Sequence, residues 1–225
     1  MTTFAIMQTA IADELVNEPV TTTQIKTAIN RAIRHYRHRP FFFNQSRTGA
    51  FNTVVDQEYY TATDLAAIAT LSRIIAMRTT ITGTTGMTNP VQERSFNDID
   101  DLQDGTMKGV PSYHAYFDNS IRLWPIPNAV LAITFSYYQR FAELSADSDT
   151  NAWLTDGEEL IRQRAKIILA LDNLHSDEIA ERCVPLEQAA LSALNAETRR
   201  RMGDMILRPE TMPVLPVSFD INRGT

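Results

Sequence analysis

Two histidines on one expected helix have a spacing that could hold a metal ion. His35 and His38 lie three residues apart, which places both imidazoles on one helical face. No acid and no third histidine lies nearby in the sequence, so a solvated helix surface is the better interpretation. The chain also lacks the P-loop, Rossmann, nucleophile-elbow, zinc-protease and calcium-loop motifs. We therefore expect no enzyme, no metal site and no cofactor.

A basic stripe on the same helix leads into an aromatic segment. Such a pairing could contact phosphates and stack on bases, but a solvated helix face followed by a plug of core aromatics is the favoured interpretation. The net charge of -6 argues against a general nucleic-acid binder, since such proteins neutralise phosphates with surplus cations. The stripe comprises Arg31, Arg34, Arg37 and Arg39, and the aromatic side chains are Tyr36 and Phe41 to Phe43.

Acidic residues gather at three places without the pattern of a calcium or catalytic site. The run of Asp98, Asp100, Asp101 and Asp104 lacks the closing Glu of a calcium loop, so a polar short helix explains it. Three aspartates flank Trp153, which we expect to anchor the last helices to the preceding region. Paired catalytic acids at 158–159 are disfavoured because Glu158 has the position of a helix-capping residue.

Composition bounds the class of protein. With 225 residues and 44% hydrophobic content, the chain can bury a sizeable core. The single cysteine, Cys183, excludes an intramolecular disulfide and is expected to be a buried small apolar residue. No run of apolar residues reaches membrane-span length, and the N-terminal segment lacks the pattern of a signal peptide, so we expect neither membrane insertion nor secretion by that route.

The first 40 residues predict a pair of helices. Apolar residues recur every three or four positions until Pro19, whose ring ends the run. Thr21 and Gln24 have the spacing of a capping box, and helical spacing then continues until Pro40. Residues 3–39 are therefore expected to form a helical hairpin.

A second helical pair is expected after residue 151. Thr155 and Glu158 have capping-box spacing, and a broad apolar face follows up to a turn at residues 175–177. Another apolar stripe continues beyond that turn. Pro185 interrupts this stripe, so we expect the last helix to kink or split near Val184.

Between the helical pairs, the sequence has the composition of strands. Thr, Val, Tyr and Phe alternate with turn residues from Phe51 onward, and a meander is the simplest connection. Residues 83–86 and the Asp118–Asn119 step are candidate hairpin turns, since Gly, Asn and Asp tolerate positive φ. A short helix is expected at about residues 95–103.

Beyond residue 202 the helical period ends in a segment rich in proline and apolar side chains. Because these side chains are costly to leave in water, we expect the arm to dock, either on its own subunit or, preferably, on a neighbour or partner. Prolines that preset the backbone reduce the entropy lost on docking. The residues expected to bind a neighbour or partner are Arg199, Arg200, Arg201, Met205, Ile206, Leu207, Arg208, Val214, Leu215, Val217 and Phe219.

Together these patterns predict an α+β fold. We expect a helical bundle from N-terminal and C-terminal helical hairpins, with an inserted antiparallel β-rich region and an extended C-terminal arm. The expected ranges are 1–48 for the first hairpin, 49–150 for the β region, 151–202 for the hairpin that completes the bundle, and 203–225 for the arm.

Several segments, in order, resemble phage head-to-tail adaptor proteins. The stretch from IADELVNEPVTTTQIKTAINRAIRHYRHRPFFFN to QEYYTATDLAAI is similar to the family's opening helix, aromatic segment and strand. RSFNDIDDL, GVPSYHAYFDNSIRLWPIPNA and LSADSDTNAWLTDGEELIRQRAKIILA are similar to its short helix, paired strands and Asn-x-Trp-x-Thr helix start. With ALNAETRRR, the resemblance covers roughly residues 11–201.

The resemblance implies a virion structural protein at the head-tail interface, made in the host cytoplasm. Such proteins bind beneath the portal protein, multiply into a ring, commonly a dodecamer, and offer their lower face to the tail or next connector protein. Genomic DNA then passes through the lumen without sequence-specific binding. A C-terminal arm in such families reaches the portal, but PETMPVLPVSFDINRGT departs from the family's pattern and leaves the partner of this arm open.

The main alternative is a β-rich binding module that recognises a host polysaccharide. Trp124, Trp153 and the tyrosines would supply its aromatic platform. Trp124 lies in an expected strand beside prolines and Trp153 precedes a helix, and packing is the usual role at such positions. A cell-wall hydrolase ranks lower because the sequence offers no positioned acid pair.

Overall fold

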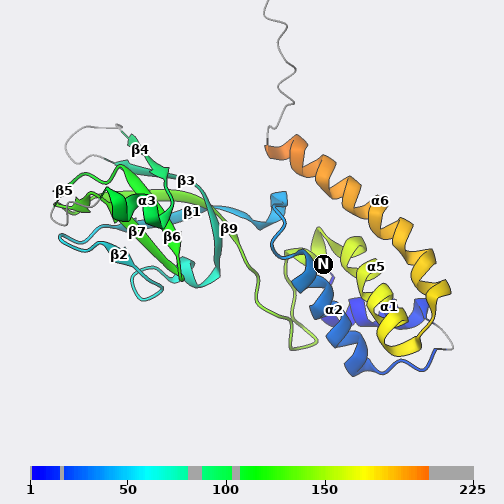
Figure 1. Ribbon diagram of the computed structural model, residues 1–225. Coiled ribbons are helices and arrows are strands. Elements are labelled where there is room, and N and C mark those ends of the chain that lie inside the picture. The colour runs from blue at the N-terminus through cyan, green and yellow to red at the C-terminus, as the bar shows by residue number, and fades with distance from the viewer. Residues whose placement is uncertain (1, 16–17, 81–87, 103–106, 203–225) are drawn as a thin grey trace, which may run out of the picture.

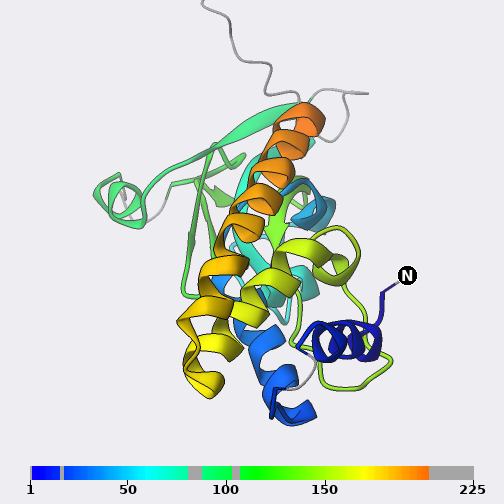
Figure 2. The ribbon, with the colours of Figure 1, turned by 90° about the vertical axis from the view of Figure 1, so that its right-hand side faces the viewer.

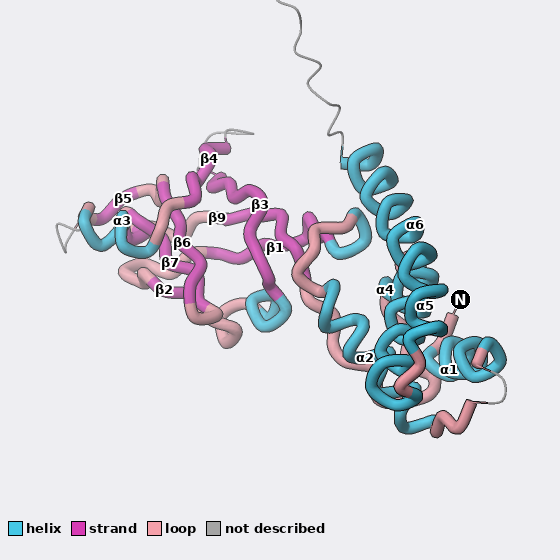
Figure 3. The backbone as a smooth tube through the Cα atoms, turned by 45° about the vertical axis from the view of Figure 1, so that its right-hand side comes forward, coloured by secondary structure: helices cyan, strands magenta, loops and turns pink. Residues whose placement is uncertain are grey.

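The computed structural model describes residues 2–15, 18–80, 88–102 and 107–202, which form two lobes side by side (Figure 1). The helical lobe consists of residues 2–44 and 140–202, and the β-lobe consists of the described residues between 45 and 139. Figure 3 shows nearly all strands on one side and the long helices on the other. Each lobe has its own buried apolar core.

In the helical lobe, α1 and α2 pack against α5, and α6 lies along α5. The core takes apolar residues from each of these helices, with α1 buried through Phe4, Met7 and Ile11 at helical spacing. The elements are α1 Phe4–Glu14, α2 Thr22–Tyr36, the 3-10 turn η1 Phe42–Asn44, α4 Ala152–Thr155, α5 Glu158–Leu169, the π-helical turn η3 Ala170–Leu174 and α6 Asp177–Met202.

Local helix signals had different outcomes. The capping box at the start of α2 is confirmed: the Thr21 N–H donates to Gln24 Oε1 at 2.8 Å, and the Gln24 N–H donates to Thr21 Oγ1 at 3.3 Å. The capping box of Thr155 and Glu158 is wrong. Asn151 caps the short α4 instead, and Glu158 Oε2 accepts a hydrogen bond from the distant Thr2 hydroxyl at 2.7 Å.

The last helix is not split at its proline. Helix α6 runs from Asp177 to Met202 with Pro185 inside, so the missing backbone donor does not end it. Packing along α5 holds both halves in one helix, with Ala180 and Cys183 buried on the near side of the proline. Cys183 is buried, as its interpretation as a small apolar residue requires.

The β-lobe contains a seven-stranded sheet in the order β1-β9-β3-β4-β6-β7-β2. A pair of short strands, β5 and β8, lies beside it, and α3 covers β6. The bounds are β1 Gln45–Asn52, β2 Tyr59–Tyr60, η2 Ala66–Thr70, β3 Leu71–Thr80, β4 Thr88–Glu93, α3 Phe96–Asp101, β5 Lys108–Gly109, β6 Tyr113–Phe117, β7 Ser120–Trp124, β8 Ile126–Pro127 and β9 Ala132–Gln139.

The predicted fold class was wrong. The β part is no antiparallel insertion in a helical bundle, because a large curled mixed sheet forms a second lobe with its own core. Strand β4 pairs with β6 in parallel, since the segment containing α3 carries the chain back across the sheet, and β5 pairs with β8 in parallel. The meander is also wrong: β1 pairs with the distant β9, and β2 with β7.

The sheet begins six residues before the expected position, at Gln45 and not at Phe51. Only Gly49 of β1 is fully buried, so this edge strand has no alternation of large apolar residues to detect. A Cβ at Gly49 would lie 2.6 Å from the ring of Phe135 on the neighbouring β9. The close approach of β1 to the core therefore requires a glycine. Because glycine has no side chain, this buried position adds nothing to the apolar alternation by which a strand is predicted.

Two other local predictions in this region are confirmed. Asp118 and Asn119 have φ of 48° and 53° and form the turn between β6 and β7. The Ser95 hydroxyl accepts a hydrogen bond from the Asp98 N–H at 3.1 Å, which caps α3. The expected turn at residues 83–86 lies outside the described residues.

Aromatic side chains pack in the core of the helical lobe beside the start of the sheet. The Trp153 ring lies edge-on to Phe41 and Phe43, with centroid distances of 5.6 Å and 4.9 Å. Phe43 belongs to η1, which leads directly into β1. The aromatic segment is thus the predicted core plug, and Trp153 holds η1, the turn that leads into the sheet, against the C-terminal helices.

Candidate interaction surfaces

The predicted partner-binding arginines lie at the C-terminal end of α6. Arg200 donates two hydrogen bonds to the Glu197 carboxylate, at 2.8 Å and 2.7 Å, and Arg201 donates to the same carboxylate. These donors lower the pKa of Glu197 to about 2. The Arg201 guanidinium also lies 4.0 Å from the centroid of the Phe42 ring. The helix end is therefore fastened to η1.

Arg199 is exposed and, unlike its two neighbours, forms no ion pair with the residues described here. It borders a shallow pocket of about 310 Å³, lined by Gln188, Leu191, Ser192, Asn195, Ala196 and Arg199. Arg200 and Arg201 are also exposed, at 74% and 54% of their side-chain surface, but both are paired with Glu197. The remaining predicted residues, Met205, Ile206, Leu207, Arg208, Val214, Leu215, Val217 and Phe219, lie outside the described residues.

A second charged surface was not predicted from the sequence. Strands β1, β3 and β9 contain three arginines and no acidic residue. Arg73 pairs in register with Tyr138 and Arg78 with Thr134, so these side chains share the outer side of the sheet. Arg47 lines a pocket of about 150 Å³ with Ile75 on the same side. We call Arg47, Ala50, Arg73, Ile75, Ala76, Arg78 and Thr134 the basic sheet face.

A third surface surrounds α3. This helix carries exposed acidic side chains at 98, 100 and 101 and no basic residue. Phe117, at the end of β6, is 63% exposed and packs against Phe96 of α3 with ring centroids 5.5 Å apart. We call Asp98, Asp100, Asp101, Leu102, Phe117 and Asp118 the acidic helix face. Sequence patterns gave the helix but no reason to join it to Phe117.

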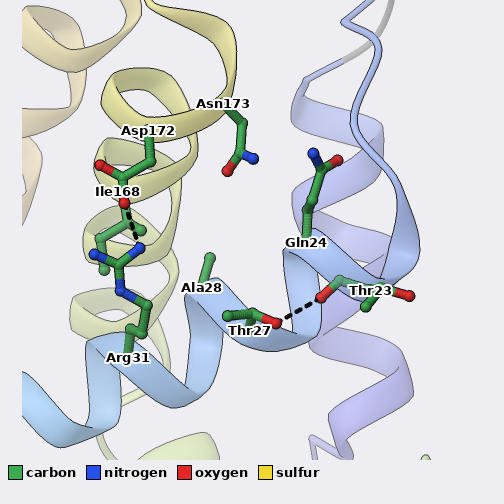
Figure 4. A pocket seen from close by; sticks show the side chains of 8 residues that line it. All are labelled: Thr23, Gln24, Thr27, Ala28, Arg31, Ile168, Asp172 and Asn173. Carbon is green, nitrogen blue, oxygen red and sulfur yellow. Dashed lines mark hydrogen bonds and ion pairs between the residues drawn. The ribbon is translucent and has the colours of Figure 1, made fainter.

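The pocket in Figure 4 lies on the helical lobe between α2 and the turn after α5. It measures about 190 Å³, and an ion pair between Arg31 and Asp172 crosses it. Thr27 directs its hydroxyl to the backbone oxygen of Thr23 at 2.9 Å. The one acid in this lining, Asp172, is paired with Arg31, and the Thr27 hydroxyl donates to the backbone, so the lining offers neither an acid pair nor a hydroxyl beside a base.

The other candidates from the sequence lie on solvated surface. His35 and His38 are exposed at the end of α2, and no cluster of metal-binding side chains occurs in the part of the chain that the structure describes. Arg31 and Arg34 form ion pairs with Asp172 and Glu143 across the helical lobe. The basic stripe is therefore a solvated helix face with local partners.

Burial perturbs three groups inside the fold. Burial lowers the pKa of His114, whose Nδ1 lies 3.1 Å from the Val91 oxygen and whose Nε2 has no partner among the described residues. Burial also raises the pKa of the Cys183 thiol. The pKa of Tyr36 is raised by burial and by its hydrogen bond to Glu187, which links α2 to α6. We therefore interpret His114, Cys183 and Tyr36 as structural residues that pack inside the fold.

The tryptophans do not form an exposed aromatic platform. Trp153 is 1% exposed in the core of the helical lobe, and Trp124 is 9% exposed beneath α3, where its ring lies 5.9 Å from Tyr113. The polysaccharide-binding alternative therefore loses both tryptophans from its aromatic platform.

Comparison with known proteins gives one match over nearly the whole chain. The family model described as SU10 adaptor protein matches residues 2–213. This protein belongs to the SU10 adaptor family. The resemblance to phage head-to-tail adaptors predicted from the sequence is confirmed, and a structural role in the phage particle follows from this membership. No curated protein matches the chain.

Among the described residues, no helix is both long enough and apolar enough to span a membrane.

Proposed function

We propose that this protein is the subunit of a dodecameric ring that assembles below the portal protein. The ring extends the DNA channel and gives the tail or next connector protein its attachment surface, while genomic DNA passes through without sequence-specific binding. The observation that carries the proposal is the adaptor-family match over residues 2–213.

The two-lobed shape supports this role. Each subunit of a ring contacts its two neighbours through two different surfaces. This heterologous contact, repeated around an axis, produces a closed ring. Each lobe keeps its own core, and Phe43, which packs on Trp153 in the helical core, lies just before the first strand of the β-lobe. The lobes therefore offer separate surfaces for neighbours and for the layers above and below.

The C-terminal arm, residues 203–225, is proposed to dock on the portal or on a neighbouring subunit. Its apolar side chains would fill grooves on that partner, and Arg199 and Arg208 would pair with acidic groups there. Arg200 and Arg201 contribute differently, since their pairs with Glu197 and the contact of Arg201 with Phe42 fix the helix end from which the arm departs.

The first test measures the mass of the purified protein alone and after mixing with portal rings, followed by imaging of any complex. A ring, formed alone or on the portal, is the expected result. A monomer that neither forms a ring nor binds the portal would contradict the proposal.

A second test removes the arm. Deletion of residues 203–225 is expected to leave the unfolding temperature nearly unchanged and to abolish portal binding. Two variants of the full chain separate the contributions: a triple change of Met205, Ile206 and Leu207 to serine removes apolar contacts, and Arg208→Ser removes charge. Undiminished portal binding by the truncated protein would refute the proposed role of the arm.

A further inference from the structure

The basic sheet face is unusual for a protein with a net charge of -6. Arg47, Arg73 and Arg78 are exposed, and none forms an ion pair with any residue within the described ranges. Between them lie Ile75, which is 44% exposed, and the exposed Ala50 and Ala76. An apolar centre with a charged rim is the arrangement found in protein–protein interfaces.

The acidic helix face combines exposed acidic and apolar side chains. Asp98, Asp101 and Leu102 are exposed on and just after α3, and Phe117, the most exposed of the large apolar side chains in the described residues, packs against Phe96 at the start of this helix. Phe117 and Asp118 also line a pocket with His38 and Arg140. Asp100 is partly engaged, because it pairs with Arg122 of β7 at 2.5 Å. The two faces thus complement each other in both charge and apolar character.

Helix α3 and the basic sheet face lie on opposite sides of the same lobe. The inner sides of β3, β7 and β9 share one core, which contains Ile74, Leu123 and Phe135. The outer sides of β3 and β9 belong to the basic sheet face, whereas the outer side of β7 lies under α3. Figure 2 shows α3 projecting from one side of the β-lobe.

We infer that the basic sheet face of one subunit binds the acidic helix face of a second copy of this chain. This inference rests on the proposed ring and identifies the contact that closes it. Because the two patches differ and α3 lies on the opposite side of the lobe from the basic sheet face, the contact between them is heterologous. When the same rotation relates each copy to the next around an axis, every basic sheet face meets the acidic helix face of its neighbour. The charges set the orientation, and Phe117 and Ile75 provide the apolar centre.

A second copy fits these observations better than DNA does. Nucleic-acid binding would use the arginines alone and would leave the acidic helix face without a partner. In a contact between two copies, the acidic helix face of one copy lies against the basic sheet face of the next. Each set of charges then neutralises the other. Binding of duplex DNA is therefore the competing outcome in the tests below.

The test uses charge reversal on each face. One full-length variant carries R47E, R73E and R78E, and the other carries D98K and D101K, with Asp100 retained because it pairs with Arg122. Sedimentation equilibrium at low ionic strength measures self-association. Each variant alone is expected to associate at least about tenfold more weakly than the original protein, because like charges then face each other.

Recombining the reversals gives the decisive result. A chain with all five changes, and a mixture of the two variants, present opposite charges at every contact, so association is expected to return. Self-association of the original protein should also weaken as salt increases, since the Debye length falls from about 30 Å at 0.01 M to about 8 Å at 0.15 M. If neither charge reversal weakened self-association, the inference would be wrong.

Controls separate this inference from the proposed function. R182E changes an exposed arginine of α6 on the other lobe and is expected to leave association within about twofold of the original. Circular dichroism checks the fold of every variant.

A ring that still forms on the portal when either face alone is reversed would refute the assigned contact but not the adaptor role. An original protein that stays monomeric at every concentration, or a sheet-face variant that loses only duplex DNA binding, would also refute the contact.

Discussion

The Arg122 guanidinium lies 2.5 Å from the Asp100 carboxylate, and this ion pair holds α3 against β7. Arg122 also lies 2.5 Å from Glu58, just before β2, and its guanidinium is 4.7 Å from the centroid of the Phe96 ring. A side chain only 2% exposed thus connects three segments of the β-lobe. The acidic helix face owes its position to this arginine.

The two acids that hold Arg122 should differ in importance. Glu58 is 16% exposed and Asp100 is 48% exposed, so solvent screens the second pair more. Glu58→Gln is expected to lower the free energy of unfolding by about 2–3 kcal/mol, and Asp100→Asn by about 1 kcal/mol or less. Urea denaturation measures both. A larger loss for the asparagine variant would contradict this ranking.

Gly49 is predicted to tolerate no side chain. In Gly49→Ala the new Cβ would lie 2.6 Å from the Phe135 ring, in the core of the β-lobe. Overpacking of this kind lowers the free energy of unfolding by about 1–3 kcal/mol. Gly109→Ala is the matched control, because its Cβ would be 3.7 Å from Pro125, an ordinary contact. Equal stability of the two variants in urea would refute the prediction.

The Tyr36 hydroxyl is expected to stabilise the contact between α2 and α6. Tyr36→Phe keeps the ring but removes the 2.5 Å hydrogen bond to the Glu187 carboxylate, and should lower the free energy of unfolding by about 1.5–3 kcal/mol. Tyr113→Phe is the control, since this hydroxyl has no hydrogen bond to the residues that the structure describes. Equal losses in the two variants would speak against a special role for Tyr36.

The same hydroxyl predicts a dependence on alkaline pH. The pKa of Tyr36 in the folded protein is raised above its ordinary value of 10.0, because burial and Glu187 disfavour the phenolate. Its stabilising contribution is therefore complete below pH 10 and is lost as pH rises from there toward the folded pKa. Urea midpoints measured above pH 10 should fall less steeply for Tyr36→Phe. Identical slopes would contradict the assignment.

Glu197 should titrate far below an ordinary glutamate. Hydrogen bonds from Arg200 and Arg201 lower its pKa from 4.5 to about 2, so the contribution of this cluster is present above pH 4.5 and is lost as pH falls toward 2. Side-chain NMR titration measures the midpoint directly. Arg200→Gln should move it upward, whereas Arg199→Gln, the neighbouring control, should move it little. A midpoint near 4.5 in the original protein would exclude the cluster.

The sequence by itself determined the local elements and the family. Apolar residues at helical spacing placed α1 and α2, Thr21 and Ser95 marked helix starts, and Asp118 marked the turn between β6 and β7. Those signals depend on residues close together in the chain, so they can be recognised without a structure. The order of the segments also carried the resemblance to head-to-tail adaptors.

Only the tertiary structure decided how the strands pair and which charges share a surface. Pairing of β1 with β9 joins residues 80 to 93 positions apart, and the buried position in β1 is Gly49, which leaves no apolar pattern. Arg47 and Arg78 lie on β1 and β3, and they share one side of the sheet only because β9 pairs with both strands. Long-range pairing depends on the complementarity of whole surfaces, which no local spacing in the sequence records.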